Sequence, residues 1–118
     1  MNKSNPLEER SLQLAINCKK YSELLDEQKQ FSQSNQFQRC SSSIGANIAE
    51  AQRAASRKDF VNKLRIASKE LSETKYWLQL FKASKNYPET SDLIKQAIEV
   101  EYILNTSIAT AIRNGKNK

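Results

Sequence analysis

The segment Cys40–Ala51, "CSSSIGANIAEA", combines three serines, a glycine and small or branched apolar residues, and its conformation decides the fold. A loop that cradles a phosphate needs several glycines, whereas this segment has only Gly45. Apolar residues instead keep helical spacing through it, at Ile44, Ile48 and Ala51. Small residues at steps of four give the same helix a second face with almost no side chains, at Ser41, Gly45 and Ala49. The segment is therefore predicted to be the thin part of an amphipathic helix.

Length and composition favour a single all-α domain. A chain of 118 residues forms one modest core. It contains two glycines and two prolines, too few for the many turns of a β-sandwich or barrel. Apolar periodicity predicts four helices, over about residues 7–28, 34–55, 57–85 and 89–113. Because their connections are short, we expect an up-and-down antiparallel four-helix bundle over residues 1–118.

Polar residues mark the expected helix ends. Ser32 and Ser34 are candidate N-caps of the second helix. Ser56 and Asp59 resemble the capping box that starts a helix. Gly115 is placed to cap the C-terminus of the fourth helix. The helix ends are thus predicted from residues that satisfy the free backbone groups there.

The chain is basic, with 19 lysines and arginines against 13 acids and a net charge of +6. The cations are concentrated between residues 53 and 69, where Asp59 is the only acid. Such a segment is compatible with a polyanionic partner. The candidate nucleic-acid-binding residues are Arg53, Arg57, Lys58, Arg65 and Lys69, of which Lys58, Arg65 and Lys69 share one helical face. The alternative is a solvated basic face that keeps the bundle soluble.

The third and fourth expected helices carry more apolar residues than one core stripe requires. An exposed apolar patch usually marks an interface, so we expect a homo-oligomer. We expect Glu70 and Glu73 to form ion pairs with lysine or arginine across that interface. Periodicity leaves open the alternative that these broad stripes face a wide core. The candidate interface residues are Ile66, Glu70, Glu73, Trp77, Ile94 and Ile98.

Nothing in the chain points to catalysis. It has no histidine, which removes the commonest general base and most zinc sites. Glu70 and Glu73 lack the Glu-x-x-His element of a di-iron bundle. Cys18 and Cys40 lie outside any metal-ligand spacing, and we expect buried free thiols. We predict a protein that is not an enzyme and takes no cofactor or metal.

The apolar runs of the chain are short. None reaches 18 residues, and the first ten residues lack the apolar segment of a signal peptide. We therefore expect a cytoplasmic protein with no membrane partner.

The segment Ser41–Leu80 resembles the family of small four-helix-bundle proteins encoded by intervening sequences within bacterial 23S ribosomal RNA genes. This family includes the accessory protein of diversity-generating retroelements. The resemblance covers about a third of the chain. It is carried by small residues, Ile-x-x-Asn-Ile-Ala-Glu, a basic linker, Asp-Phe, Leu-x-Ile-Ala and a Glu-x-x-Glu-x-x-Tyr-Trp segment, in "SSSIGANIAEAQRAASRKDFVNKLRIASKELSETKYWLQL".

The resemblance maps family signatures onto individual residues. It places Asn47, Ile48, Ala49 and Glu50 in the second-helix signature, Asp59 and Phe60 at the start of the third helix, and Glu70, Glu73 and Trp77 in the third-helix signature. Many relatives look to have proline at the position of Gly45 and glycine at that of Ala51. The first difference implies a bend near residue 45 that is kept by different means. The second implies that the second helix continues further toward Arg53.

The resemblance also implies an assembly and a partner. The family fold assembles as a homopentamer, and in the retroelement branch a basic surface binds nucleic acid and a reverse transcriptase. No firm biochemical role comes with the ribosomal branch. Two functions therefore stay open: an oligomeric accessory factor that binds RNA or DNA through the basic residues, or an oligomeric scaffold with no nucleic-acid role.

Overall fold

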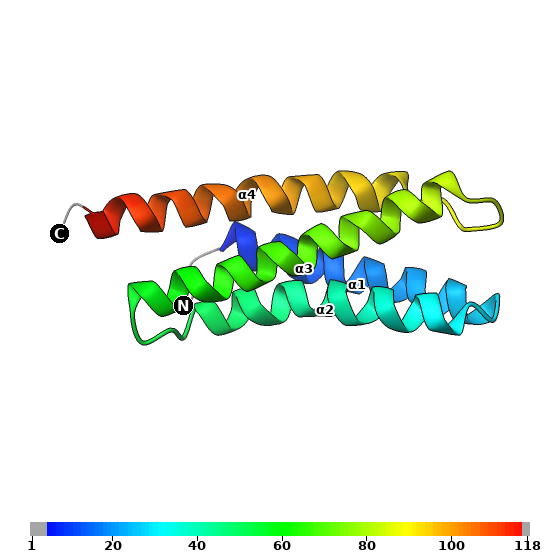
Figure 1. The fold of residues 1–118 in the computed structure, drawn as a ribbon, viewed down its shortest axis with the longest axis horizontal. Coiled ribbons are helices and arrows are strands. Elements are labelled where there is room, and N and C mark those ends of the chain that lie inside the picture. The colour runs from blue at the N-terminus through cyan, green and yellow to red at the C-terminus, as the bar shows by residue number, and fades with distance from the viewer. Residues whose placement is uncertain (1–4, 117–118) are drawn as a thin grey trace.

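The computed structural model describes residues 5–116, and within them the chain forms four α-helices and no strand. The helices run alternately up and down (Figure 1) and are α1 (Pro6–Glu27), α2 (Phe31–Ala51), α3 (Arg57–Ala83) and α4 (Ser91–Lys116). The backbones of α1 and α3 each lie beside those of α2 and α4 but not beside one another, so α1 and α3 lie diagonally across the bundle. The predicted four-helix bundle is confirmed.

The core is formed by the apolar stripes of the four helices and includes an aromatic cluster near the turns that join α1 to α2 and α3 to α4. Three aromatic rings meet there, one each from α1, α2 and α3: Tyr21, Phe37 and Phe81, with ring centroids 5.5 to 5.6 Å apart. The Tyr21 hydroxyl donates a hydrogen bond of 2.8 Å to the carbonyl of Pro88. Because Pro88 lies in the α3–α4 turn, the cluster fixes that turn as well as three helices.

Two helix starts have side-chain caps. The Asn5 side chain accepts a hydrogen bond of 3.1 Å from the backbone amide of Glu8 at the start of α1. The Ser56 hydroxyl accepts one of 3.0 Å from the amide of Asp59 at the start of α3. The predicted serine cap of the third helix is therefore confirmed.

The start of α2 differs from the prediction. The helix begins at Phe31 after Gln30, which makes no side-chain cap hydrogen bond, so neither Ser32 nor Ser34 is the N-cap. Ser34 is instead buried, and its hydroxyl donates to the carbonyl of Ser22 across the α1–α2 contact at 3.1 Å. The chain reverses at Lys29, whose φ of 62° lies in the left-handed region. A lysine carries no sequence signal for that conformation, so the sequence predicts the start of α2 too late.

The ends of α2 and α4 also differ from the prediction. α2 stops at Ala51, because the amides of Gln52, Arg53 and Ala54 bond to carbonyls three residues back and tighten the chain into a turn. The expected continuation toward Arg53 is wrong, and Ala55 lies exposed in the turn. Gly115 lies inside α4, with no positive φ, and does not cap it. None of the four helices, over the described residues, is long and apolar enough to cross a membrane.

Candidate nucleic-acid interface

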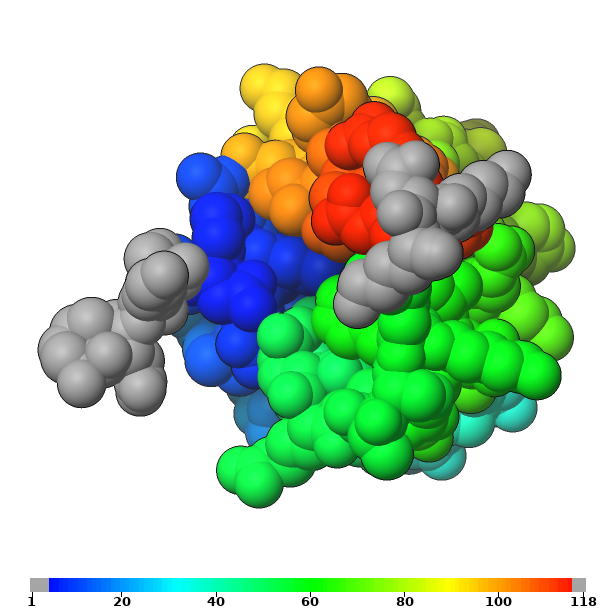
Figure 2. Space-filling view, turned by 90° about the vertical axis from the view of Figure 1, so that its left-hand side faces the viewer, coloured from blue at the N-terminus to red at the C-terminus, as the bar shows by residue number. Residues whose placement is uncertain are grey.

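The five candidate cations lie at one end of the bundle and along the first half of α3. Figure 2 looks onto this end, where long side chains project from the green start of α3 and the turn before it. All five side chains are exposed: Arg53 in the turn, and Arg57, Lys58, Arg65 and Lys69 on α3. Lys58, Arg65 and Lys69 follow the helical repeat along one outward stripe, as predicted.

Arg57 does not belong to this stripe, and its side chain lies over the end of α4. A Cβ added at Gly115 would come within 2.8 Å of the Arg57 Cδ, so the arginine stem covers the glycine. Beside it, a shallow groove of about 360 Å³ separates α3 from α4 and is lined in part by Arg57, Lys58 and Arg65. The structure thus brings three of the five cations to one groove.

None of the five forms an ion pair within residues 5–116. Two other α3 lysines do: Lys63 lies 3.1 Å from Glu50, and Lys75 lies 2.7 Å from Glu101. The cations of α3 therefore fall into two groups, one that joins helices and one whose charge faces solvent. Exposed cations without an ion pair are suited to contact phosphates, because no existing ion pair has to be broken first.

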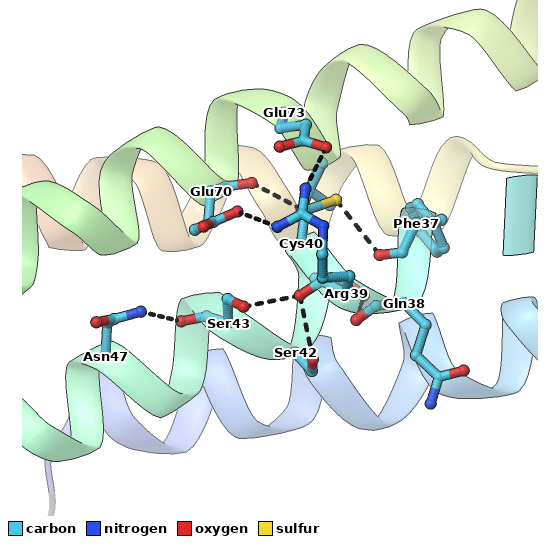
Figure 3. Close-up of polar contacts among 11 residues, drawn as sticks. Phe37, Gln38, Arg39, Cys40, Ser42, Ser43, Asn47, Glu70 and Glu73 are labelled. Carbon is cyan, nitrogen blue, oxygen red and sulfur yellow. Dashed lines mark hydrogen bonds and ion pairs between the residues drawn. The ribbon is translucent and has the colours of Figure 1, made fainter. Parts of the chain in front are cut away.

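The predicted interface residues do not gather on one face. Glu70 and Glu73 both bind Arg39 of α2, at 3.4 and 2.6 Å (Figure 3), and the hydrogen bond to Glu73 raises the pKa of Arg39. The expected pairing to arginine is therefore made within the chain. Trp77 and Ile94 are partly buried against the core. The remaining two, which are exposed but lie on different helices, are Ile66 and Ile98.

The serines of the opening segment bond to the preceding turn of their own helix. The hydroxyls of Ser42 and Ser43 both donate to the carbonyl of Arg39, at 3.2 and 2.8 Å (Figure 3). The Asn47 amide donates to the carbonyl of Ser43 at 2.8 Å. These bonds are typical of serine and asparagine within a helix and assemble no nucleophile with a base.

Gly45 and Ala49, from the small-residue face of α2, line an apolar groove against α1. The groove has a volume of about 260 Å³. Its walls carry mostly small residues, and it is bordered by Leu12, whose exposed fraction is 61%. The lining residues are Glu8, Ser11, Leu12, Ala15, Ser42, Gly45, Ala46 and Ala49. α2 is an unbroken helix through this segment.

Cys18 and Cys40 are free thiols and both are buried, as predicted. The part of the chain that the structure describes holds no group of three or more cysteine, aspartate or glutamate side chains arranged to bind a metal ion.

The charge count along the sequence missed residues of α4. Lys95 and Arg113 are exposed on α4, which flanks α3, and neither has an ion-pair partner among the described residues. Tyr76 on α3 and Tyr102 on α4 are also exposed. The sequence signal for these two cations and two tyrosines is the spacing of exposed positions along each helix. This spacing can be identified once the core stripe of the helix is known.

Comparison with known proteins identifies the family. Residues 4–116 match the 23S rRNA-intervening sequence protein family. A crystal structure of a protein of unknown function from the S23 ribosomal protein family of Bacteroides thetaiotaomicron VPI-5482 has 38% sequence identity and a TM-score of 0.82, over 86% of this chain and 97% of that one. The comparison with curated proteins gave no match. The chain therefore belongs to the 23S rRNA-intervening sequence protein family.

Proposed function

We propose that this protein is a non-catalytic accessory factor that binds RNA or DNA through the basic surface of α3 and the turn before it. The observation that carries the proposal is the group of five exposed cations without an ion pair in the described chain. A protein with a net charge of +6 attracts polyanions at long range, and such a cluster directs them to one site. Where a reverse transcriptase gene adjoins this one, the polymerase is a further expected partner.

The test measures binding of a fluorescently labelled RNA hairpin by anisotropy at several salt concentrations. The logarithm of the affinity should fall linearly with the logarithm of the salt concentration, because phosphate contacts release counterions. Arg65→Glu combined with Lys69→Glu should abolish binding. The matched control, Lys20→Glu with Lys85→Glu, makes the same change in net charge at two exposed lysines outside this surface and should retain most of the affinity. Binding that ignores salt, or that both pairs weaken equally, contradicts the proposal.

We also propose that the chain assembles with copies of itself, as a pentamer, and that the α1–α2 groove is a contact surface. The groove is concave, mostly apolar and bordered by the exposed Leu12, which supports a helix of a second copy as its occupant. Glu70 and Glu73 are already paired with Arg39, which leaves Ile66 and Ile98 as the available members of the predicted interface.

Light scattering on the purified chain tests this assembly. The expected molar mass is about five times that of the 13.5 kDa chain. Leu12→Glu should dissociate the oligomer, whereas Leu24→Glu, a change of the same kind on α1 outside the groove, should not. Ile98→Glu tests the α4 alternative: dissociation by this variant alone moves the interface from the groove to α4. A monomer at micromolar concentration contradicts the assembly itself.

A further inference from the structure

A stripe on the outer side of α3 contains both cations and an aromatic ring. Its members follow one another at steps of three or four residues, and every one is exposed: Lys58, Asn62, Arg65, Lys69, Ser72 and Tyr76. At about 1.5 Å per residue the stripe is about 27 Å long. It therefore begins with positive charge at the start of α3 and finishes with a tyrosine in the second half of that helix.

A second tyrosine lies on the same side of the molecule, on α4. Lys75 and Glu101 form the 2.7 Å ion pair between α3 and α4, and Tyr76 and Tyr102 directly follow them. Each following residue is rotated by about 100° in the direction of its own helix, and α3 and α4 run in opposite directions, so both rotations lead to the same side. The exposed fractions of 63% for Tyr76 and 74% for Tyr102 show that this is the solvent side.

Tyr102 belongs to an exposed stripe on α4 that also lacks acids. Its members recur at steps of three or four residues: Lys95, Ile98, Tyr102, Asn105, Ala109 and Arg113. The two stripes together form the α3–α4 outer face.

Four of the six acids of α3 and α4 form ion pairs with residues of other helices. The other two, Asp59 and Asp92, lie in the first turns of their helices and belong to neither stripe. Glu70 and Glu73 pair with Arg39 on α2, and Glu99 pairs with Arg10 on α1. Glu101 is held by Lys75. The α3–α4 outer face therefore presents cations, amides and two tyrosine rings to solvent.

The Tyr76 ring is held in place by its neighbour. Its centroid lies 6.0 Å from that of Trp77 in an edge-to-face arrangement, and Trp77 is itself packed against the core. A ring so positioned offers a flat surface at little entropic cost. Aromatic rings beside unpaired cations are the combination with which proteins bind single strands, because cations follow the phosphates while bases stack on the rings.

We infer that the α3–α4 outer face binds a single-stranded segment of nucleic acid, with bases stacked on Tyr76 and Tyr102 and phosphates on the cations beside them. This inference rests on the proposed nucleic-acid function and narrows its ligand to unpaired nucleotides. A duplex satisfies the cations but keeps its base faces stacked internally, so it gains nothing from the tyrosines.

The test compares labelled oligothymidine with a duplex of the same length. Tyr76→Ala and Tyr102→Ala should each lower the affinity for the single strand about tenfold and leave duplex binding unchanged. The salt dependence should keep its slope in both variants, because tyrosine carries no charge. Tyr76→Phe and Tyr102→Phe retain the ring and should retain the affinity. The matched control is Phe31→Ala, which removes an exposed aromatic ring on α2.

The outcomes distinguish failure of this inference from failure of the proposed nucleic-acid function. Salt-dependent binding that Arg65→Glu with Lys69→Glu abolishes, but that both tyrosine variants keep, overturns the stacking and retains the basic surface. No binding of either probe by the unmodified protein overturns both. Equal losses for single strand and duplex, or a changed molar mass of the tyrosine variants, mean that the rings serve the fold or contacts between copies, and this also overturns the inference.

Discussion

At the scale of single residues, Gly45 is not required by the contact between α1 and α2. A Cβ at this position would lie 3.7 Å from the carbonyl oxygen of Ser11 and 3.8 Å from its hydroxyl, which are ordinary contact distances. Glycine in a helix interior costs about 1 kcal/mol relative to alanine. Gly45→Ala should therefore raise the free energy of unfolding by about 0.5 to 1 kcal/mol, measured by urea denaturation. A loss of stability would show that α1 lies closer to α2 than these distances.

The two cysteines give a prediction for pH. Burial raises the pKa of the Cys18 thiol to about 12 and also raises that of Cys40. Unfolded thiols ionise near pH 8.5, so above that pH the unfolded state releases protons that the folded state keeps. The contribution of the protonated thiols to the free energy of unfolding is complete below about pH 8.5, and it falls as pH rises toward the pKa of the folded state. Unfolding free energies measured from about pH 8 to 9.5 should decline, and less steeply in Cys18→Ala.

The reactivity of the two thiols tests their burial and protonation independently. Neither cysteine of the folded protein should react with a disulfide reagent at about pH 8, because only the thiolate attacks. Both should react once urea unfolds the chain. Rapid reaction of the native protein would contradict the buried, protonated state of the thiols.

At the scale of the helices, the start of α3 depends on one side chain. Ser56→Ala removes the 3.0 Å bond from the amide of Asp59 and should lower the free energy of unfolding by about 1 kcal/mol. Ser32→Ala is the matched control, because Ser32 is exposed in the first turn of α2 and does not cap it. It should change stability by less than about 0.5 kcal/mol in urea denaturation. Equal effects would mean that the cap contributes nothing.

These ends also show what sequence could predict at this scale. Apolar positions such as Ile44, Ile48 and Ala51 are buried as expected, because burial follows the helical period. The Ser56 cap is predictable because it is local. The start of α2 is not, since it depends on Lys29 in a left-handed conformation and on Ser34 bonding across to α1. Tertiary contacts of this kind leave no periodic signal.

The candidate site was predictable to the same extent and for the same reason. Lys58, Arg65 and Lys69 share a stripe because spacing within one helix is fixed by the helical repeat. The contribution of α4 depends on which turn of α4 lies beside which turn of α3, and the Lys75–Glu101 pair shows that register. The pairing of Arg39 with Glu73 likewise joins different helices, so spacing along the sequence does not show that these glutamates have an arginine partner within the chain.

At the scale of the whole molecule, charge is divided between the two sides of the bundle. The α3–α4 outer face is cationic, whereas α1 carries acids in its first turn and pairs Lys19 with Glu23. Like charges at steps of four repel one another, so the basic stripe lowers the stability of the free protein. A polyanion bound there relieves this repulsion. Stability and binding should therefore respond in opposite directions to a change of charge at the stripe.

The variant Arg65→Glu tests whether stability and nucleic-acid binding respond in opposite directions. The variant replaces repulsion between Arg65 and Lys69 with a glutamate four residues before a lysine, the favourable order for an ion pair on a helix. Its free energy of unfolding should rise by about 0.3 to 0.5 kcal/mol at low salt, and the gain should shrink as salt is added. Nucleic-acid affinity should fall, with a shallower salt dependence, because one phosphate contact is lost. A variant that loses stability and affinity together would mean that Arg65 supports the fold, and the cationic stripe would then be a structural feature of α3.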